Sequence, residues 1–171
     1  MTSREAGTAS VPAIRPAGPE DAPGVAALLI ELGYPGDSVG QVRERLARWA
    51  RAENATVLVA EYQARLAGAV AVTAIPYFEH EGSWGRIVAL VVAEGNRGRG
   101  IGRLLVESAE QAALGLGCIT MELTSARRRP EAHAFYRAVG YLDWCSLSAR
   151  YVKDLVPGAS AGSYAMRGDP P

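Results

Sequence analysis

In the first third of the chain, one short extended stretch is followed by apolar residues at helical spacing. A strand is predicted around Ile14, followed by a helix in which Val25 to Leu32 repeat on one side and which ends at Gly33. A second helix is predicted from Val39 to Ala52 by the same spacing. The chain therefore begins as a strand followed by two amphipathic helices.

The middle of the chain changes to the pattern of strands. The runs TVLVAEY and RLAGAVAVTAI predict two strands joined by a tight turn near Gln63 and Ala64, and hence an antiparallel hairpin. Glycine, proline and charged residues predict a loop from Pro76 to Gly85, and an apolar run predicts a strand from Ile87 to Val92.

Beyond Val92, three glycines precede a further amphipathic helix that ends near Gly115 and Gly117. The run CITMELTS predicts the next strand, and RPEAHAFYRAVG predicts a short helix with Pro130 in its first turn and Gly140 at its end. The run YLDWCSLSARYVKDL predicts one or two more strands.

This order of elements predicts an α/β fold. A strand, a helix and a second strand around the glycines form a crossover, which requires a parallel strand pair beside the antiparallel hairpin. We expect a single domain from residue 11 to 155, with a mixed, mostly antiparallel sheet flanked by helices. Residues 1–10 are expected to be a flexible N-terminus, and the Gly/Pro/Ser-rich residues 156–171 a disordered tail.

Composition narrows the functional classes. The 171 residues are 49% hydrophobic, which supports one core, and the formal net charge of +0 gives no reason to expect nucleic acid or a membrane surface as partner. The apolar runs are too short to span a bilayer, and the polar start does not resemble a signal peptide. Cys118 and Cys145 lack the spacing of metal ligands, so no metal is expected. A cytoplasmic protein is the expectation.

The stretch VALVVAEGNRGRGIGRLL, from Val88 to Leu105, carries the most specific chemistry. A strand runs into glycines at the start of a helix, where unpaired amides and the helix dipole favour an anion such as a diphosphate. The chain lacks the Gly-Lys pair of a P-loop. The glycines alternate and lie late in the chain, so the pattern fits the dinucleotide-binding fingerprint poorly as well.

The run RGRGIG instead resembles the R/Q-x-x-G-x-G/A signature of the GNAT superfamily of acetyl-CoA-dependent N-acetyltransferases. The stretch HAFYRAVGY resembles that family's Tyr-x-x-x-Gly-aromatic ending, and IRPAGPEDAPGVAALLIELGYP resembles a common opening of the family. The similarity covers roughly Ile14 to Leu155. It implies a GNAT-like sheet whose parallel strand pair forms the cofactor slot.

The resemblance also implies which residues bind acetyl-CoA. The turn would hold the pyrophosphate, the strand before it would line the pantetheine arm, and a bulge there would direct the N–H of Val91 or Val92 at the thioester carbonyl. Ser125 would meet the pantetheine, and Arg129 or its neighbours a phosphate. The residues implied are Leu90, Val91, Val92, Arg97, Gly98, Arg99, Gly100, Ile101, Gly102, Arg103, Ser125 and Arg129.

For catalysis, the resemblance implies that Tyr136 protonates the departing thiolate, since a phenol is still protonated at neutral pH. The proton acceptor is open. Many relatives carry an acid on the fourth strand, where this chain has Val88 and Ala89. The candidates are therefore Glu122, His80 with its loop neighbours Glu79 and Glu81, or an ordered water.

The leading hypothesis is an enzyme that transfers the acetyl group of acetyl-CoA to a primary amine of a small molecule or peptide by direct attack. The alternative is a non-catalytic acyl-CoA-binding module with a sensing or regulatory role. Acetyl-CoA and an amine acceptor are the expected partners, and the protein is expected to be a monomer or homodimer.

Overall fold

A computed structural model describes residues 11–149, 151 and 155 of the 171-residue chain. They belong to two compact units, divided between Ala126 and Arg127. The predicted flexible N-terminus and the predicted tail, residues 1–10 and 156–171, lie outside the described residues.

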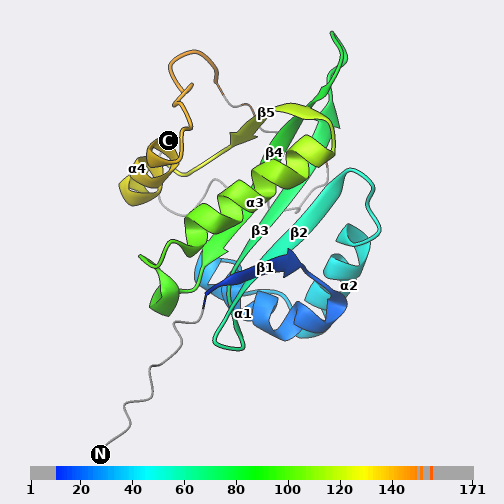
Figure 1. The fold of residues 1–171 in the computed structure, drawn as a ribbon, viewed down its shortest axis with the longest axis vertical. Coiled ribbons are helices and arrows are strands. Elements are labelled where there is room, and N and C mark those ends of the chain that lie inside the picture. Colours follow the sequence, from blue (N-terminus) through cyan, green and yellow to red (C-terminus); the bar gives the residue numbers. More distant parts are fainter. Residues whose placement is uncertain (1–10, 150, 152–154, 156–171) are drawn as a thin grey trace, which may run out of the picture. The chain divides into compact units, whose positions relative to one another are not determined.

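The first unit contains a five-stranded sheet in the order β1-β2-β3-β4-β5 (Figure 1). Among the described strands, the first four pair antiparallel, whereas β4 and β5 run parallel. The strands are β1 (Ala13–Pro16), β2 (Ala55–Tyr62), β3 (Arg65–Pro76), β4 (Ser83–Val92) and β5 (Cys118–Leu123). The predicted mixed, mostly antiparallel sheet with one parallel pair is confirmed.

Three α-helices and two short 3-10 helices complete the described part of this unit. They are η1 (Pro19–Asp21), α1 (Ala22–Leu32), α2 (Val39–Trp49), η2 (Glu94–Asn96) and α3 (Ile101–Gly115). Gly33 ends α1 in the left-handed conformation at φ 103°, as predicted. The predicted end of α2 at Ala52 is three residues too late, because the last amides there bond to carbonyls three residues back and close a turn after Trp49.

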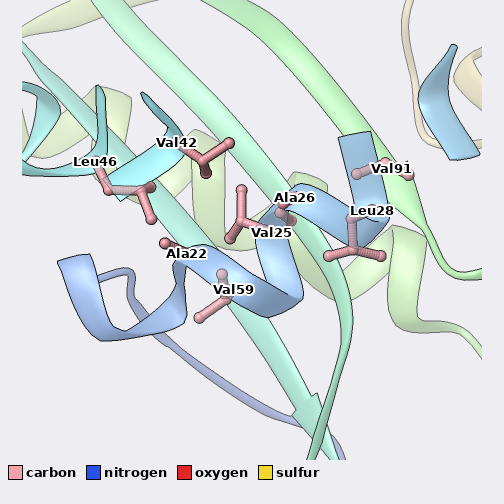
Figure 2. Packing of buried hydrophobic residues seen from close by; sticks show 9 residues of the cluster. Ala22, Val25, Ala26, Leu28, Val42, Leu46, Val59 and Val91 are labelled. Atoms are coloured by element: carbon pink, nitrogen blue, oxygen red, sulfur yellow. The ribbon is translucent and has the colours of Figure 1, made fainter. Parts of the chain in front are cut away.

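The helices cover opposite faces of the sheet (Figure 1). Apolar residues of α1 and α2 pack with Val59 of β2 and Val91 of β4 (Figure 2). Ala69 of β3 belongs to the same cluster. On the other face, α3 lies so close that a Cβ at Gly68 would come within 2.9 Å of Leu105. Gly68 therefore lets α3 approach β3 closely.

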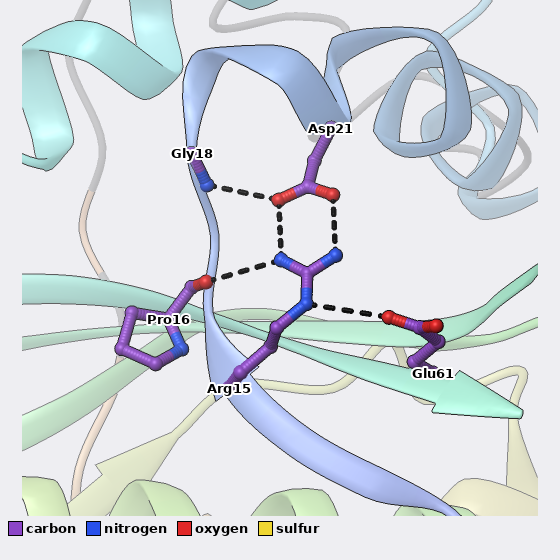
Figure 3. A network of polar contacts seen from close by, with 5 residues as sticks. All are labelled: Arg15, Pro16, Gly18, Asp21 and Glu61. Carbon is purple, nitrogen blue, oxygen red and sulfur yellow. Dashed lines mark hydrogen bonds and ion pairs between the residues drawn. The ribbon is translucent and has the colours of Figure 1, made fainter. Parts of the chain in front are cut away.

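A polar network holds β1 to the start of the helices (Figure 3). The Arg15 guanidinium donates two hydrogen bonds of 2.8 Å to the Asp21 carboxylate, which also accepts the Gly18 amide at 2.9 Å. Arg15 donates further to Glu61 of β2 at 3.4 Å. Asp21 is 8% exposed, and these hydrogen bonds lower its pKa because they stabilise the carboxylate.

The hairpin turn between β2 and β3 lies at Gln63 and Ala64, as predicted. Both residues have positive φ, 51° and 58°, which glycine or asparagine usually supplies. The loop after β3 is shorter than predicted. β4 begins at Ser83 rather than Ile87, because its first residues pair with β3 on one side and with β5 on the other.

The second unit contains α4 (Pro130–Ala138), with Pro130 in its first turn and Gly140 beyond its end at φ 97°. The prediction of strands after Gly140 is wrong for the described residues 141–149, 151 and 155, which contain none. Part of this segment turns back instead, since the Trp144 carbonyl accepts the amides of Leu147 and Ser148. Nowhere in the described ranges is there a helix with the length and apolar content to cross a membrane.

Candidate active site

The parallel strands β4 and β5 pair only along part of β4. Their register runs from Ser83 opposite Cys118 to Ile87 opposite Leu123, where β5 ends. From Ala89 to Val92, β4 keeps its antiparallel partner β3, and from Val88 to Val92 it has no partner on the β5 side among the described residues. This leaves a short length of unpaired strand edge directly before the glycine-rich turn.

A β-bulge lies at the start of this edge. Ala71 pairs with Ala89 and Val72 with Ile87, so Val88 is the additional residue on β4. The expected bulge therefore exists, but it lies at Val88 rather than beside Val91 and Val92.

The direction of the edge amides follows from the alternation of an antiparallel ladder. The Ala93 amide donates to the Ala67 carbonyl at 2.9 Å, so the next hydrogen-bonded pair is Val91 with Ala69. Val91 thus directs its amide at β3, whereas Leu90 and Val92 direct theirs at the unpaired edge. Of the two amides proposed to face a ligand, Val92 has the suitable orientation.

The glycine-rich turn brings open backbone to the start of α3. Gly98 and Gly100 have φ of 75° and 80°, and a Cβ at either would meet no atom within 4 Å. Gly100 caps α3, and its carbonyl accepts the amide of Leu104 at 3.1 Å. The amides ahead of this bond and the helix dipole give the turn positive potential, which suits a phosphate.

The other predicted residues of the turn divide between core and surface. Ile101 is buried with 1% exposure, so only its backbone faces a ligand, and Gly102 is half-buried. Arg97, Arg99 and Arg103 are exposed. The Arg97 Nε donates to the Val92 carbonyl at 3.2 Å, and the Arg99 guanidinium lies 5.8 Å from the centre of the Tyr62 ring. Arg97 thus lies at the end of the unpaired edge.

Two further predicted residues follow the parallel strands. Glu122 of β5 forms an ion pair with Arg86 of β4, and Arg86 also donates to the Thr124 hydroxyl at 3.3 Å. The Ser125 Oγ is buried and has no hydrogen-bond partner among the described residues. A buried hydroxyl without a partner is costly, so this atom is available to a ligand group that reaches it.

His80 lies on the loop between β3 and β4. Its Nδ1 is 2.9 Å from the Glu81 carbonyl, and its ring centre is 4.0 Å from that of Tyr77, whose hydroxyl lies 2.7 Å from the Thr120 hydroxyl on β5. The loop is thereby held to β5. No hydrogen bond or ion pair joins His80 to Glu122 among these contacts.

Tyr136 and Arg129 belong to the second unit. The Tyr136 ring lies 5.3 Å from Phe135 and 6.1 Å from Tyr141, centre to centre. Burial raises the pKa of the Tyr136 hydroxyl, and the positive charge of Arg129 opposes the rise in part. The hydroxyl is therefore protonated throughout the neutral range. Arg129 precedes α4 and lies 3.7 Å from Glu131 in an ion pair.

Arg86 and Glu31 are two polar residues near the site that the sequence patterns did not reveal. The Arg86 pairing depends on the register of β4 and β5, which no local pattern encodes. The Glu31 side chain of α1 accepts the Glu94 amide at 2.8 Å and so fixes the chain between β4 and the glycine-rich turn. In the sequence, Glu31 is marked only as a carboxylate near the end of a predicted helix.

The parallel strand pair stops early beside a glycine-rich helix start, as the resemblance to the GNAT superfamily implies. The family model of the acetyltransferase (GNAT) family matches residues 25–141, and the chain belongs to this family of acetyltransferases. The expected family and enzyme class are confirmed.

Structures of three similar proteins support the fold. A putative acetyltransferase from Agrobacterium tumefaciens is 26% identical with a TM-score of 0.73, covering 83% of this chain and 99% of its own. Glucosamine-6-phosphate N-acetyltransferase from Arabidopsis thaliana is 21% identical with a TM-score of 0.72, over 85% and 99%. An aminoglycoside N-acetyltransferase in complex with CoA is 14% identical with a TM-score of 0.73, over 86% and 96%. No curated protein matches the chain significantly.

Proposed function

We propose that this acetyltransferase transfers the acetyl group of acetyl-CoA to a primary amine of a small molecule or peptide. The observation that carries the proposal is the unpaired edge of β4 leading directly into the glycine-rich start of α3. An extended arm with a diphosphate at its end fits such a strand edge followed by an anion-binding turn.

The backbone of the turn from Gly98 to Arg103 binds the pyrophosphate in this proposal. The open space at Gly98 and Gly100 gives a phosphate access to the backbone, and Arg97 and Arg99 supply positive charge nearby. Leu90 offers its edge amide to the pantetheine arm, Val92 lies on the same edge, and the Val91 side chain is part of the core. The buried Ser125 hydroxyl, which lacks a partner among the described residues, is available to the same arm.

In the chemical step, the neutral amine forms a bond to the thioester carbon and the carbon–sulfur bond then breaks. The Val92 amide stabilises the negative charge that develops on the carbonyl oxygen. Tyr136 donates its proton to the departing thiolate, since its raised pKa keeps the hydroxyl protonated. The amine loses one proton to the acceptor considered next, and Tyr136 regains a proton from solvent, so the products are a neutral amide and a neutral thiol.

Glu122, His80 or an ordered water accepts the proton from the amine. The ion pair with Arg86 holds the Glu122 carboxylate in place. The His80 Nδ1 contacts the Glu81 carbonyl, so Nε2 is the ring nitrogen left to take the proton from the amine. Glu122→Gln and His80→Gln distinguish the candidates: a large loss of kcat with an unchanged affinity for acetyl-CoA identifies the proton acceptor. If neither variant lowers kcat, water is the acceptor.

Attack is direct, without an acetylated enzyme. Cys118 is buried with 4% exposure, and burial raises the pKa of its thiol, so it is a poor nucleophile. Initial rates at varied concentrations of both substrates should give intersecting double-reciprocal lines. Parallel lines would indicate a covalent intermediate and contradict this part of the proposal.

The experiment that tests the function follows free thiol while the protein is incubated with acetyl-CoA and a panel of primary amines. We expect thiol release that depends on the amine, with one acetylated product per thiol. Tight binding of acetyl-CoA without amine-dependent release would instead indicate the non-catalytic module, which the comparisons do not support.

A further inference from the structure

Arg86 is a charged residue on the sheet surface whose part in the proposed reaction is so far limited to holding the Glu122 carboxylate. It lies in the last part of β4 that pairs with β5, one residue before the final pair Ile87 and Leu123. The unpaired edge begins immediately afterwards. Arg86 therefore lies beside the start of the unpaired strand edge along which the proposed acetyl donor binds.

The side chain of Arg86 points away from α3. Its neighbour Gly85 faces α3, because a Cβ there would lie 3.1 Å from the Ala113 Cβ. Successive residues of a strand point to opposite faces, so Arg86 and its register partner Glu122 lie on the other face. Both side chains reach the surface, with 27% and 48% exposure.

The Arg86 guanidinium carries more N–H donors than its neighbours accept. A guanidinium carries five N–H donors, and Arg86 uses Nη1 for Glu122 and Nη2 for Thr124. Its other N–H groups have no acceptor among the described residues. The pair therefore presents a free cationic edge and a carboxylate side by side.

These two charges suit a ligand that carries both signs. A carboxylate binds a guanidinium through paired hydrogen bonds. A phosphate would also bind Arg86, but its double negative charge would lie beside the Glu122 carboxylate. A zwitterion instead places its ammonium group near Glu122, where the attraction is favourable.

We propose that Arg86 binds the carboxylate of the acceptor, and that the acceptor is a free amino acid. This inference rests on the proposed function and specifies its substrate class. The amino group then lies next to Glu122, one of the three candidate proton acceptors, where β5 stops pairing with β4. Arg86 is a specificity residue and leaves the binding of acetyl-CoA unchanged.

The test begins with the wild-type enzyme and the standard amino acids as acceptors. The best amino acid is compared with its amide and with the amine that lacks the carboxyl group. We expect the KM for the amino acid to be about 10- to 100-fold lower than for the other two, as one charged hydrogen-bonded contact suggests. Equal or better use of the amide and amine would overturn the inference while leaving the proposed function intact.

Arg86→Gln should raise the KM for the amino acid by a similar factor and change that for the amine by less than about threefold. The affinity for acetyl-CoA should stay unchanged. Arg45→Gln is the matched control, because Arg45 also forms a single ion pair, with Asp37 at 2.7 Å, on α2. It should leave all these constants unchanged.

Arg86→Lys keeps the charge and covers the case in which the glutamine variant does not fold. It should retain part of the preference for the amino acid. Loss of activity to the same extent for every acceptor, in either folded variant, would make Arg86 a structural residue. If the wild type acetylates no amine, the proposed function and this inference are both overturned.

Discussion

Replacement of Asp21 by asparagine tests whether the Arg15–Asp21 network stabilises the first unit. The carboxylate accepts two hydrogen bonds from Arg15 and one from the Gly18 amide, and Asp21 is only 8% exposed. An asparagine keeps one oxygen but turns an N–H toward a guanidinium that has only donors. We expect Asp21→Asn to lower the free energy of unfolding.

The magnitude follows from what the substitution leaves behind. Loss of one charged hydrogen bond and conflict at a second correspond to about 2–3 kcal/mol at pH 7. Breaking a fully buried ion pair costs more, but the Arg15 side chain is 39% exposed and regains water. Asp37→Asn is the control: its partner Arg45 lies 2.7 Å away and its side chain is 30% exposed, so a loss below about 1 kcal/mol is expected.

The dependence on pH gives a second criterion. The pKa of Asp21 is lowered in the folded protein, so its contribution is present above the unfolded-state pKa of about 3.9 and is lost as the pH falls toward the folded-state value. Urea unfolding followed by circular dichroism at pH 7 and pH 3 should show a smaller difference between wild type and variant in acid. A loss no greater than that of Asp37→Asn, or a difference independent of pH, would refute the reasoning.

Three further substitutions test the site and its support. Gly100→Val, at a φ of 80°, should weaken acetyl-CoA binding by calorimetry at least about tenfold, and unchanged affinity would contradict the anion-binding turn. Tyr136→Phe should lower kcat by about 100-fold and leave acetyl-CoA affinity unchanged, whereas equal losses would make it a packing residue. Gly68→Val should lower the free energy of unfolding by about 1–3 kcal/mol in urea titrations, because a Cβ would lie 2.8 Å from the Val91 carbonyl oxygen. An unchanged urea midpoint would contradict this expectation and show that α3 can move to make room for the side chain.

The order of elements was predictable because it depends on local signals. Gly33 and Gly140 end helices, and the turn at Gln63 was located between two strand patterns even without a glycine. The parallel pair then followed from the crossover around the glycines, whereas the full strand order was found only in the structure.

The finer features of the site depend on register, which the sequence pattern does not specify. The bulge falls at Val88, and this position decides that Val92 rather than Val91 directs its amide outward. The Arg86–Glu122 pair joins residues 36 positions apart, so neither residue alone predicts the other. The role of Tyr136 stays a prediction, since it depends on placing α4 against the sheet.

The unpaired length of β4 also has a consequence for the behaviour of the protein at high concentration. From Val88 to Val92, one row of amides and carbonyls lacks a strand partner among the described residues, as at the rim of a sheet. Such rows accept strands from other molecules and promote aggregation. A cosubstrate bound along this row would keep strands of other molecules from pairing with it, in addition to supplying the acetyl group. Acetyl-CoA in excess should therefore slow self-association in proportion to site occupancy.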